Sequence, residues 1–365
     1  MATPLYEHAR HQSLPQGTFH SGLWWERFFN AYRDDDFGAP KENAARFVTD
    51  LAGQCGDAAQ LEAARERIGS VVNVCGGRIA VYRLDCWHLV TGLGIEHPTE
   101  NGFSWHRTLG TPYLPGSSVK GLVRGWIEWN GAEHTYYGRI EDWFGSPDKD
   151  PQTWPESYAS RAGWFIFFDS LPTGPVTLAA DVMTPHMGQW YENGGEIAAR
   201  NGAPDPEVVP ADWHSPNPII FLVVKEAVFQ FGVAIRENLP AEARQSAESE
   251  LDDVMKVLSE ALQWAGAGAK TAAGYGRMTQ VKEALPAVLE KMIAEVKKAN
   301  RIPDDKVDDV WRGQPLAKAW AALPEGEEKV AVKAAIMAIW KEKGWWESPQ
   351  GAGKKAKAIY EGTAP

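Results

Sequence analysis

VFQFGVAI (228–235), a long segment at 241–264 and GAGAKTAAGYGRM (266–278) follow one another directly in the chain, and their order decides the fold. In the first stretch every second residue from Phe229 to Ile235 is large and apolar, which is typical of a strand. The second stretch repeats its apolar residues at helical spacing, so we expect an amphipathic helix. A strand and a helix that lead into a glycine-rich loop therefore form the centre of the predicted fold.

The remaining elements are predicted from shorter patterns. Apolar or alternating runs predict further strands at 78–86, 164–168, 176–180 and 219–224. Helices are expected at 21–35, which is rich in aromatic residues, and at 42–68, which is rich in Ala. Beyond residue 281 the composition shifts to Ala, Lys, Glu and Trp with interrupting prolines, so 281–365 is predicted to be a helical extension.

Composition places the chain among folded proteins of the cytoplasm. Its 365 residues are 44% hydrophobic and 23% charged, which excludes a disordered chain. No window approaches 18 uninterrupted apolar residues, and the first residues lack the apolar region of a secretory signal, so we expect neither a membrane span nor secretion. Cys55, Cys75 and Cys86 are too few and too scattered for a disulfide framework or a zinc site. We therefore expect a reducing cytoplasm, no metal and no cofactor.

The charge balance restricts the kind of nucleic-acid role that is possible. The formal net charge is −11, and the acidic excess lies in residues 1–280, because residues 281–365 hold slightly more basic than acidic residues. A free-standing DNA- or RNA-binding protein usually has a basic surface, since neutralising phosphates supplies most of its non-specific affinity. Any nucleic-acid role must therefore depend on local basic or backbone-donor sites inside an assembly.

The first candidate site is the loop and helix in TLGTPYLPGSSVKGLVRGWIEW (108–129). The two serines suit the N-cap of a helix, and its basic residues lie opposite its apolar face. That face is expected to hold Val119, Leu122, Val123, Trp126 and Ile127. Amides and basic side chains at such a helix start can hold a phosphate; the alternative is an ordinary capped helix with a solvated basic face. The candidate site residues are Gly116, Ser117, Ser118, Lys120 and Arg124.

The second candidate site is GAGAKTAAGYGR (266–277). It lacks the pattern of a Walker A loop, because Ala269 stands where a glycine must precede Lys270, and it follows a helix rather than a strand. We therefore do not expect nucleotide hydrolysis. Glycines still let backbone N–H groups approach an anion; the alternative is a tight helix-to-strand connection that needs positive φ angles. The candidate residues are Gly266, Gly268, Lys270, Thr271, Gly274, Tyr275, Gly276 and Arg277.

A long irregular insertion at 181–218, rich in Pro, Gly, Asn and His, is the third candidate site, since long ordered loops are usually functional. Asp181 and His186 are of the types used in acid–base catalysis, but no nucleophile or metal motif accompanies them, which favours loop-anchoring roles. Two tryptophan pairs, 24–25 and 345–346, can stack on bases but are more typical of a core or an interface.

These elements carry a family resemblance. LPGSSVKGLVRG (114–125) together with GAGAKTAAGYGR (266–277) resembles the hallmark of the RAMP superfamily of CRISPR effector proteins. Four blocks also resemble, in order, the family of the sixth-named subunit of the Cmr, or type III-B, RNA-targeting complex. They are SGLWWERFF (21–29), TLGTPYLPGSSVKG (108–121), DVMTPHMGQWY (181–191) and PNPIIFLVV (216–224). The resemblance covers most of residues 20–280 and does not extend to 281–365.

The resemblance implies an α+β fold, with a ferredoxin-like core of the RNA-recognition-motif type in residues 1–280 and the helical extension after it. It also implies a filament of similar subunits wound along a guide RNA (crRNA), with this subunit capping the end near the guide's 3′ region. The implied partners are guide RNA, target RNA, the repeated backbone subunit and the other capping subunit. Both glycine elements would contact the guide backbone. The 181–218 insertion would resemble the β-hairpin thumb that kinks the guide–target duplex, with thumb residues Asp181, Thr184 and His186.

The resemblance further implies that the protein is not an enzyme. In this family, target cutting belongs to a thumb-loop Asp of the repeated backbone subunit, and the capping subunit is generally regarded as non-catalytic. The alternative is a metal-dependent endoribonuclease of the same superfamily that acts through Asp181 or His186. Met187 departs from the family pattern, in which an aromatic residue tends to follow the histidine, and this weakens a stacking role for that position.

Overall fold

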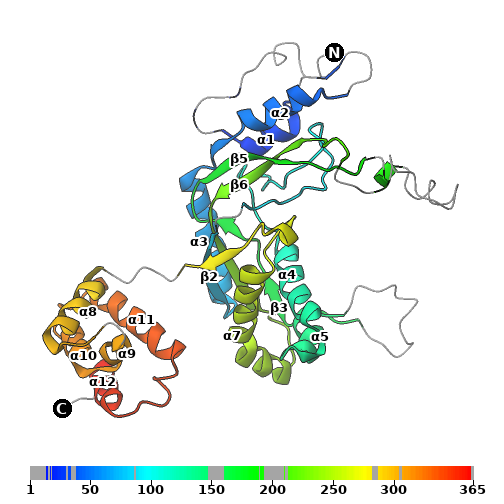
Figure 1. Cartoon of the computed structure of the whole chain (residues 1–365). Helices are drawn as coiled ribbons and strands as arrows, with labels where there is room; N and C mark the ends of the chain where they lie inside the picture. Colours follow the sequence, from blue (N-terminus) through cyan, green and yellow to red (C-terminus); the bar gives the residue numbers. More distant parts are fainter. Residues whose placement is uncertain are drawn as a thin grey trace. The chain divides into compact units, whose positions relative to one another are not determined.

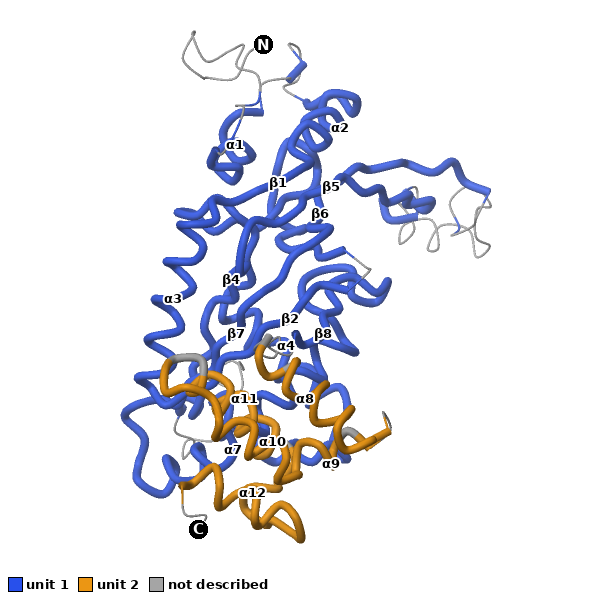
Figure 2. Tube along the Cα trace, turned by 90° about the vertical axis from the view of Figure 1, so that its left-hand side faces the viewer, with its two compact units in different colours: residues 1–281 blue, residues 282–365 orange. Residues whose placement is uncertain are grey.

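The computed structural model divides the chain into two units, Met1–Val281 and Lys282–Pro365, which are described separately (Figure 2). Among the described residues, no helix combines the length and the apolar character that crossing a membrane requires. The structure describes residues 14, 17, 19–29, 32–33, 38–85, 88–146, 160–188, 190–192, 209, 213–281, 287–303 and 306–362.

Two antiparallel sheets form the first unit (Figure 1). The larger sheet has the strand order β3–β7–β2–β8, with β4 beside β7, and the smaller has the order β1–β5–β6. The strands predicted from apolar and alternating runs are all confirmed. The strand bounds are β1 (Gly53–Cys55), β2 (Arg78–Leu84), β3 (Phe165–Phe167), β4 (Leu171–Pro172), β5 (Val176–Met183), β6 (Ile219–Glu226), β7 (Val228–Ile235) and β8 (Met278–Gln280).

Helices cover both faces of the larger sheet. On one face, the ring of Tyr82 packs edge-on against Phe231, with ring centroids 5.3 Å apart, and helix α7 packs against β2 and β7. On the other face, a Cβ at Gly232 would lie 2.8 Å from Val72 of α3, so glycine at that position lets α3 approach the sheet. Helix α4 packs beside α7. The helices of this unit are α1 (Ser21–Arg27), α2 (Lys41–Asp50), α3 (Ala58–Val74), α4 (Gly116–Asn130), α5 (Ile140–Phe144) and α7 (Ala241–Trp264).

The helix predictions are confirmed in part. The helix expected at 241–264 has those bounds, whereas α1 ends well before residue 35. The single helix expected at 42–68 is wrong, because the strand β1 separates α2 from α3. Gly53 and Gly56 have φ angles of 132° and 101°, which a helix does not accommodate, and the residues between them pair with β5.

The β5–β6 hairpin leads into the described ends of the 181–218 insertion (Figure 1). The two strands pair as far as Met183 and Ile219. Beyond that pair, the amide of Asn217 donates to the carbonyl oxygen of Pro185 at 3.0 Å. The first part of the insertion is therefore an extension of the hairpin.

The second unit is helical in its described part and has a hydrophobic cluster of its own. Trp345 and Trp346 pack against this cluster, and Trp24 and Trp25 are buried in the first unit, so the expected packing role of both tryptophan pairs is confirmed. The helices of the second unit are α8 (Ala287–Asn300), α9 (Val307–Arg312), α10 (Gln314–Ala321), α11 (Glu327–Glu342) and α12 (Ala352–Tyr360).

Candidate nucleic-acid interface

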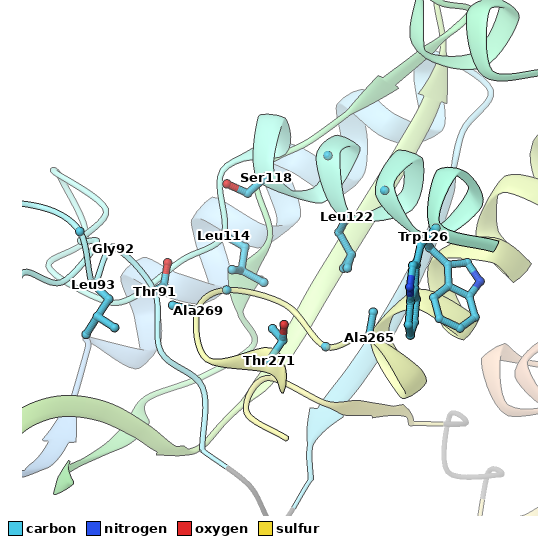
Figure 3. Close-up of a pocket in the computed structure, with 16 residues that line it drawn as sticks. Thr91, Gly92, Leu93, Leu114, Ser118, Leu122, Trp126, Ala265, Ala269 and Thr271 are labelled. Atoms are coloured by element: carbon cyan, nitrogen blue, oxygen red, sulfur yellow. The ribbon is translucent and has the colours of Figure 1, made fainter. Parts of the chain in front are cut away.

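The two glycine elements predicted from the sequence meet at one cavity of about 580 Å³ (Figure 3). It lies between α4, the loop that follows α7 and the segment 91–94. None of the sixteen described residues that line it carries a charge. Helix α4 contributes Ser118, Gly121, Leu122, Gly125, Trp126 and Trp129. The loop contributes Ala265, Gly266, Gly268, Ala269 and Thr271.

The loop after α7 lies directly against neighbouring backbone. The amide of Ala269 donates to the carbonyl oxygen of Val90 at 2.7 Å. A Cβ at Gly268 would lie 2.1 Å from that same oxygen, and one at Gly276 would lie 1.8 Å from the oxygen of Ala267. Glycine at these two positions is therefore required by the chain's own packing, as the tight-connection alternative expects. Positive φ angles also occur at Gly266, Lys270 and Gly274.

The glycines of α4 have a different setting. A Cβ at Gly121 or Gly125 would meet no atom within 4 Å, so no internal contact requires glycine there. A glycine in a helix interior costs about 0.5–1 kcal/mol relative to alanine. Leu122 and Trp126, expected on the apolar face of the helix, are partly buried against the hydrophobic core, and each also lines the cavity. The side of α4 that carries Gly121 and Gly125 therefore forms an open wall at the edge of the core.

The start of α4 corrects the expected capping. The helix begins at Gly116, so Ser117 and Ser118 lie inside its first turn and neither is the N-cap residue, which is Pro115. The amide of Gly116 donates to Asp169 Oδ1 at 2.7 Å. An internal carboxylate therefore already occupies one of the amides that was expected to face a phosphate.

The basic side chains of α4 lie away from the cavity. Helical periodicity places Lys120 and Arg124 on the face opposite its cavity-lining residues. Arg124 Nε donates to Glu128 Oε1 at 2.8 Å. Burial lowers the pKa of Lys120, and the nearby positive charges of Arg124 and Arg236 lower it further. These three cations form a basic cluster that is separate from the uncharged cavity.

Three polar side chains of the glycine loop, those of Lys270, Tyr275 and Arg277, also lie outside the cavity lining. Lys270 Nζ lies 5.5 Å from the centroid of the Phe221 ring on β6. The hydroxyl of Tyr275 donates to Asp181 Oδ2 on β5 at 2.6 Å. Arg277 Nε is buried and has no hydrogen-bond partner among the described residues. The loop thus connects the cavity to the base of the β5–β6 hairpin.

Both oxygens of Asp181 are engaged inside the protein. The amide of Val182 donates to Oδ1 at 2.7 Å, and His88 Nδ1 lies 3.3 Å from Oδ2, which also accepts the Tyr275 hydroxyl. Burial alone would raise the pKa of Asp181, but the hydrogen bonds from Tyr275, Val182 and His88 outweigh it and hold the pKa below its usual value. Burial and the bond to this carboxylate raise the pKa of Tyr275 to about 12.

The other thumb residues lie farther along the insertion. His186 Nδ1 lies 3.1 Å from the carbonyl oxygen of His214, which ties the two arms of the insertion together. Thr184 is exposed. Residues 193–208, in the same candidate thumb, lie outside the described part of the chain. Within the described part, no group of three or more His, Cys, Asp or Glu side chains is placed to hold a metal ion.

Sequence reasoning missed the third wall of the cavity and its most exposed aromatic residue. The segment 91–94 comes from a loop whose contact with the glycine element is not local in sequence. Trp129 is 77% exposed. Its position could have been found from helical spacing, which places it on the same side of α4 as Gly121 and Gly125.

Residues 67–279 match the RAMP superfamily, and since this is more than half of the chain, the protein belongs to that superfamily. In an alignment 240 residues long, which covers 53% of this chain, it is 30% identical to the CRISPR system Cmr subunit Cmr6 of Pyrococcus furiosus. The matched region spans 65% of that relative, which is a little less than two thirds of its length.

Two solved structures also resemble the chain. One is a cryo-EM structure of the type III-B Cmr-beta bound to cognate target RNA; the match has 19% identity and a TM-score of 0.44 and covers 66% of this chain and 71% of that chain. The other is the crystal structure of Cmr6 from Pyrococcus furiosus; the match has 24% identity and a TM-score of 0.29 and covers 56% of this chain and 98% of that chain.

A glycine packed against backbone in the loop and a glycine in open space on α4 should respond in opposite ways to substitution by alanine. Gly276→Ala places a Cβ against a carbonyl oxygen at a φ of 74°, and we expect a loss of about 3 kcal/mol or more in the free energy of unfolding. Gly121→Ala, the matched control in open space, should raise that free energy by about 0.5–1 kcal/mol. Urea unfolding of the full chain measures both values, and equal effects of the two substitutions would contradict the assignment.

The link between Tyr275 and Asp181 predicts a pH-dependent stability difference. Since folding lowers the pKa of Asp181, the stabilisation from its charged form is present above the ordinary value of 3.8 and is lost as the pH falls through the lower, folded value. Tyr275→Phe should therefore lower the free energy of unfolding by about 1–2 kcal/mol at pH 7. The difference from the unmodified protein should shrink below pH 3.8.

The control for this prediction is Tyr191→Phe, which changes an exposed tyrosine. It should have little effect at any pH, since surface substitutions away from such contacts are usually near neutral. An effect of Tyr275→Phe that stays constant from pH 7 to acid would show that the hydrogen bond to the carboxylate is not its cause.

Proposed function

We propose that the protein is a non-catalytic RNA-binding scaffold subunit of a type III-B CRISPR effector complex. In this proposal it caps the filament near the 3′ end of the guide RNA and helps hold the guide–target duplex for RNA-targeted antiviral defence. Its partners are the guide and target RNA, the repeated backbone subunit and the other capping subunit. The 30% identity to Cmr6 supports this class of complex.

The observation that carries the proposal is that two glycine elements, about 150 residues apart in sequence, line one cavity. If the first element were only a capped helix and the second only a tight helix-to-strand connection, neither would need the other beside it. A surface built from both elements, each of which also carries two cations outside the cavity lining, suits sequence-independent contact with an RNA strand, which proteins hold mostly through phosphates and 2′-hydroxyls.

The cations provide the phosphate contacts in this proposal. Lys120 lies beside two arginines, so its positive charge is repelled within the protein and an added anion relieves that repulsion. Arg277 has a buried Nε without a partner among the described residues, and a guanidinium suits a phosphate oxygen. Neither of these two cations needs to contact a particular base.

The fold proposed for residues 1–280 is the ferredoxin-like core. In chain order β2, α4, β3, β7, α7 and β8 alternate as βαββαβ, which is the order of that motif. The sheet order β8–β2–β7–β3 places the first and third of these strands at its centre. We propose that residues 281–365 are an extension to this core and that the 181–218 insertion serves as the thumb.

The same proposal gives Asp181 a positioning role. Its carboxylate holds Tyr275 and so fixes the glycine loop against β5. Both of its oxygens accept hydrogen bonds within the protein, from the Val182 amide and the Tyr275 hydroxyl, as a positioning role requires. This supports the scaffold role over the endoribonuclease alternative.

Two paired substitutions test the RNA-binding role. Tagged protein is purified from its host, and bound RNA and co-purifying subunits are identified by sequencing and mass spectrometry. We expect repeat-derived short RNA together with several RAMP subunits. Lys120→Ala with Arg124→Ala, or Lys270→Ala with Arg277→Ala, should lower the guide RNA recovered per complex several-fold, since each removes two phosphate-binding cations.

The control for these pairs is Lys256→Ala with Lys225→Ala, two cations on α7 and β6 that belong neither to α4 nor to the glycine loop. It should leave the recovered guide RNA unchanged. A normal amount of recovered guide RNA in both test variants would contradict the assignment of these cations to RNA binding. Recovery of the unmodified protein alone, without RNA or partner subunits, would contradict the proposed function itself.

Asp181→Asn distinguishes the scaffold role from the endoribonuclease alternative. Asparagine removes the charge and keeps one acceptor oxygen, which can take either the Tyr275 hydroxyl or the Val182 amide; thermal unfolding of the variant checks that it folds. We expect reconstituted complex with this variant to cut target RNA at every position with unchanged rates. Loss of one cleavage product, with guide RNA retained, would favour the alternative.

A further inference from the structure

We propose that the cavity between α4 and the glycine loop binds one unpaired nucleoside of the RNA, with its base stacked on Trp129. This inference rests on the proposed function and adds to it, because it assigns the cavity a ligand different from a phosphate. Three observations support it: the exposed indole of Trp129, the open wall of α4 and the absence of charge among the described residues of the cavity lining.

The lining of the cavity suits a base and a ribose. None of the sixteen described lining residues is ionised, whereas sites that hold phosphate normally supply cations or charge-assisted donors. Hydroxyl groups of Thr91, Ser118 and Thr271 line it among apolar and glycine residues (Figure 3). Its volume of about 580 Å³ lies within the usual range for small-molecule sites. A flat, uncharged group with hydrogen-bonding edges fits such a lining.

Trp129 provides the stacking surface. It is 77% exposed, and its ring lies 5.6 Å from that of Trp126 at an interplanar angle of 62°. This edge-to-face contact orients the Trp129 indole at the cavity wall without burying it. Exposed aromatic rings beside basic surface are the common means by which proteins hold single-stranded RNA, since every base has a face that can stack.

The open wall of α4 explains two glycines that the fold does not require. Gly121 and Gly125 are one turn apart on the side of α4 that carries Trp129, and a Cβ on either would meet nothing of the protein. Glycine weakens a helix, so its presence at both positions needs another reason. Close approach of a flat ligand to the helix backbone supplies that reason.

The distribution of charge favours RNA over a protein side chain as the occupant. The cationic cluster that includes Lys120 lies on the opposite face of α4, and Lys270 and Arg277 belong to the loop but not to the lining. A strand that crosses this region places its phosphates at the cations and turns a base into the uncharged cavity. A protein partner would not require cations on the two elements, α4 and the glycine loop, that also form the neutral cavity.

Photocross-linking in the assembled complex tests the proposal. The complex is reconstituted with guide RNA that carries 5-iodouridine at single positions, irradiated and digested, and the cross-linked peptides are identified by mass spectrometry. We expect one guide position to cross-link to Trp129. Trp129→Ala should abolish this cross-link, and Trp129→Phe should retain part of it. Trp264→Ala, which removes a 59% exposed tryptophan outside the cavity lining, should leave it unchanged.

Salt dependence separates base stacking from phosphate contact. Trp129→Ala, or Gly121→Leu, which fills the cavity, should weaken guide RNA binding by about 5- to 150-fold at every salt concentration. The slope of log Kd against log salt should not change, because no phosphate contact is lost. Lys120→Ala with Arg124→Ala should instead reduce that slope.

The outcomes distinguish this inference from the proposed function. Guide RNA bound normally by Trp129→Ala and Gly121→Leu, with no cross-link at Trp129, would overturn the nucleoside site and leave the scaffold role standing. Loss of a partner subunit in Trp129→Ala, with the RNA contact unchanged, would overturn it in favour of a protein-docking surface. A complex that contains no RNA would overturn the proposed function.

Discussion

The backbone of the loop after α7 rests on the backbone of the segment that follows β2. Gly276 donates its amide to the His88 carbonyl at 2.9 Å, and Ala269 donates to Val90 at 2.7 Å. Side chains larger than hydrogen do not fit at Gly268 or Gly276. This contact gives the loop two sides: one forms a wall of the cavity, and the other carries Tyr275 to the β5–β6 hairpin. Both features depend on the close approach of these two backbone segments.

Because of this two-sided arrangement, the charged side chains and the uncharged cavity-lining residues lie on different sides of α4 and of the loop. On α4, three groups of positions follow from one helical period: a buried stripe against the core, a wall of small and aromatic residues, and a basic face. On the loop, small residues line the cavity while Lys270, Tyr275 and Arg277 do not. Such a separation suits a polymer whose repeating unit combines a charged backbone with a neutral base.

Local patterns predicted what local forces determine. The strand 228–235 and the helix 241–264 follow from alternation and helical spacing, with Pro240 before the helix and a glycine after it. The strand β1 was missed because it exists only through pairing with β5, more than 100 residues away. In the site, both glycine elements were found from composition. Their meeting at one cavity, the amide of Gly116 bound to Asp169 and the link from Tyr275 to Asp181 are contacts between distant segments, which no single stretch of sequence reveals.

The acidic chain and the uncharged cavity together constrain how the proposed subunit would hold RNA. Non-specific affinity grows with the number of phosphates neutralised, and this surface offers few cations in a chain with a net charge of −11. Long-range attraction therefore does not bring RNA to the free protein. Short-range contacts, which are stacking, hydroxyl hydrogen bonds and a few charge-assisted bonds, act only once the strand is already in place. In the proposed complex, neighbouring subunits would position the guide and so supply that condition. An acidic subunit would then need a suitable cavity rather than a basic surface.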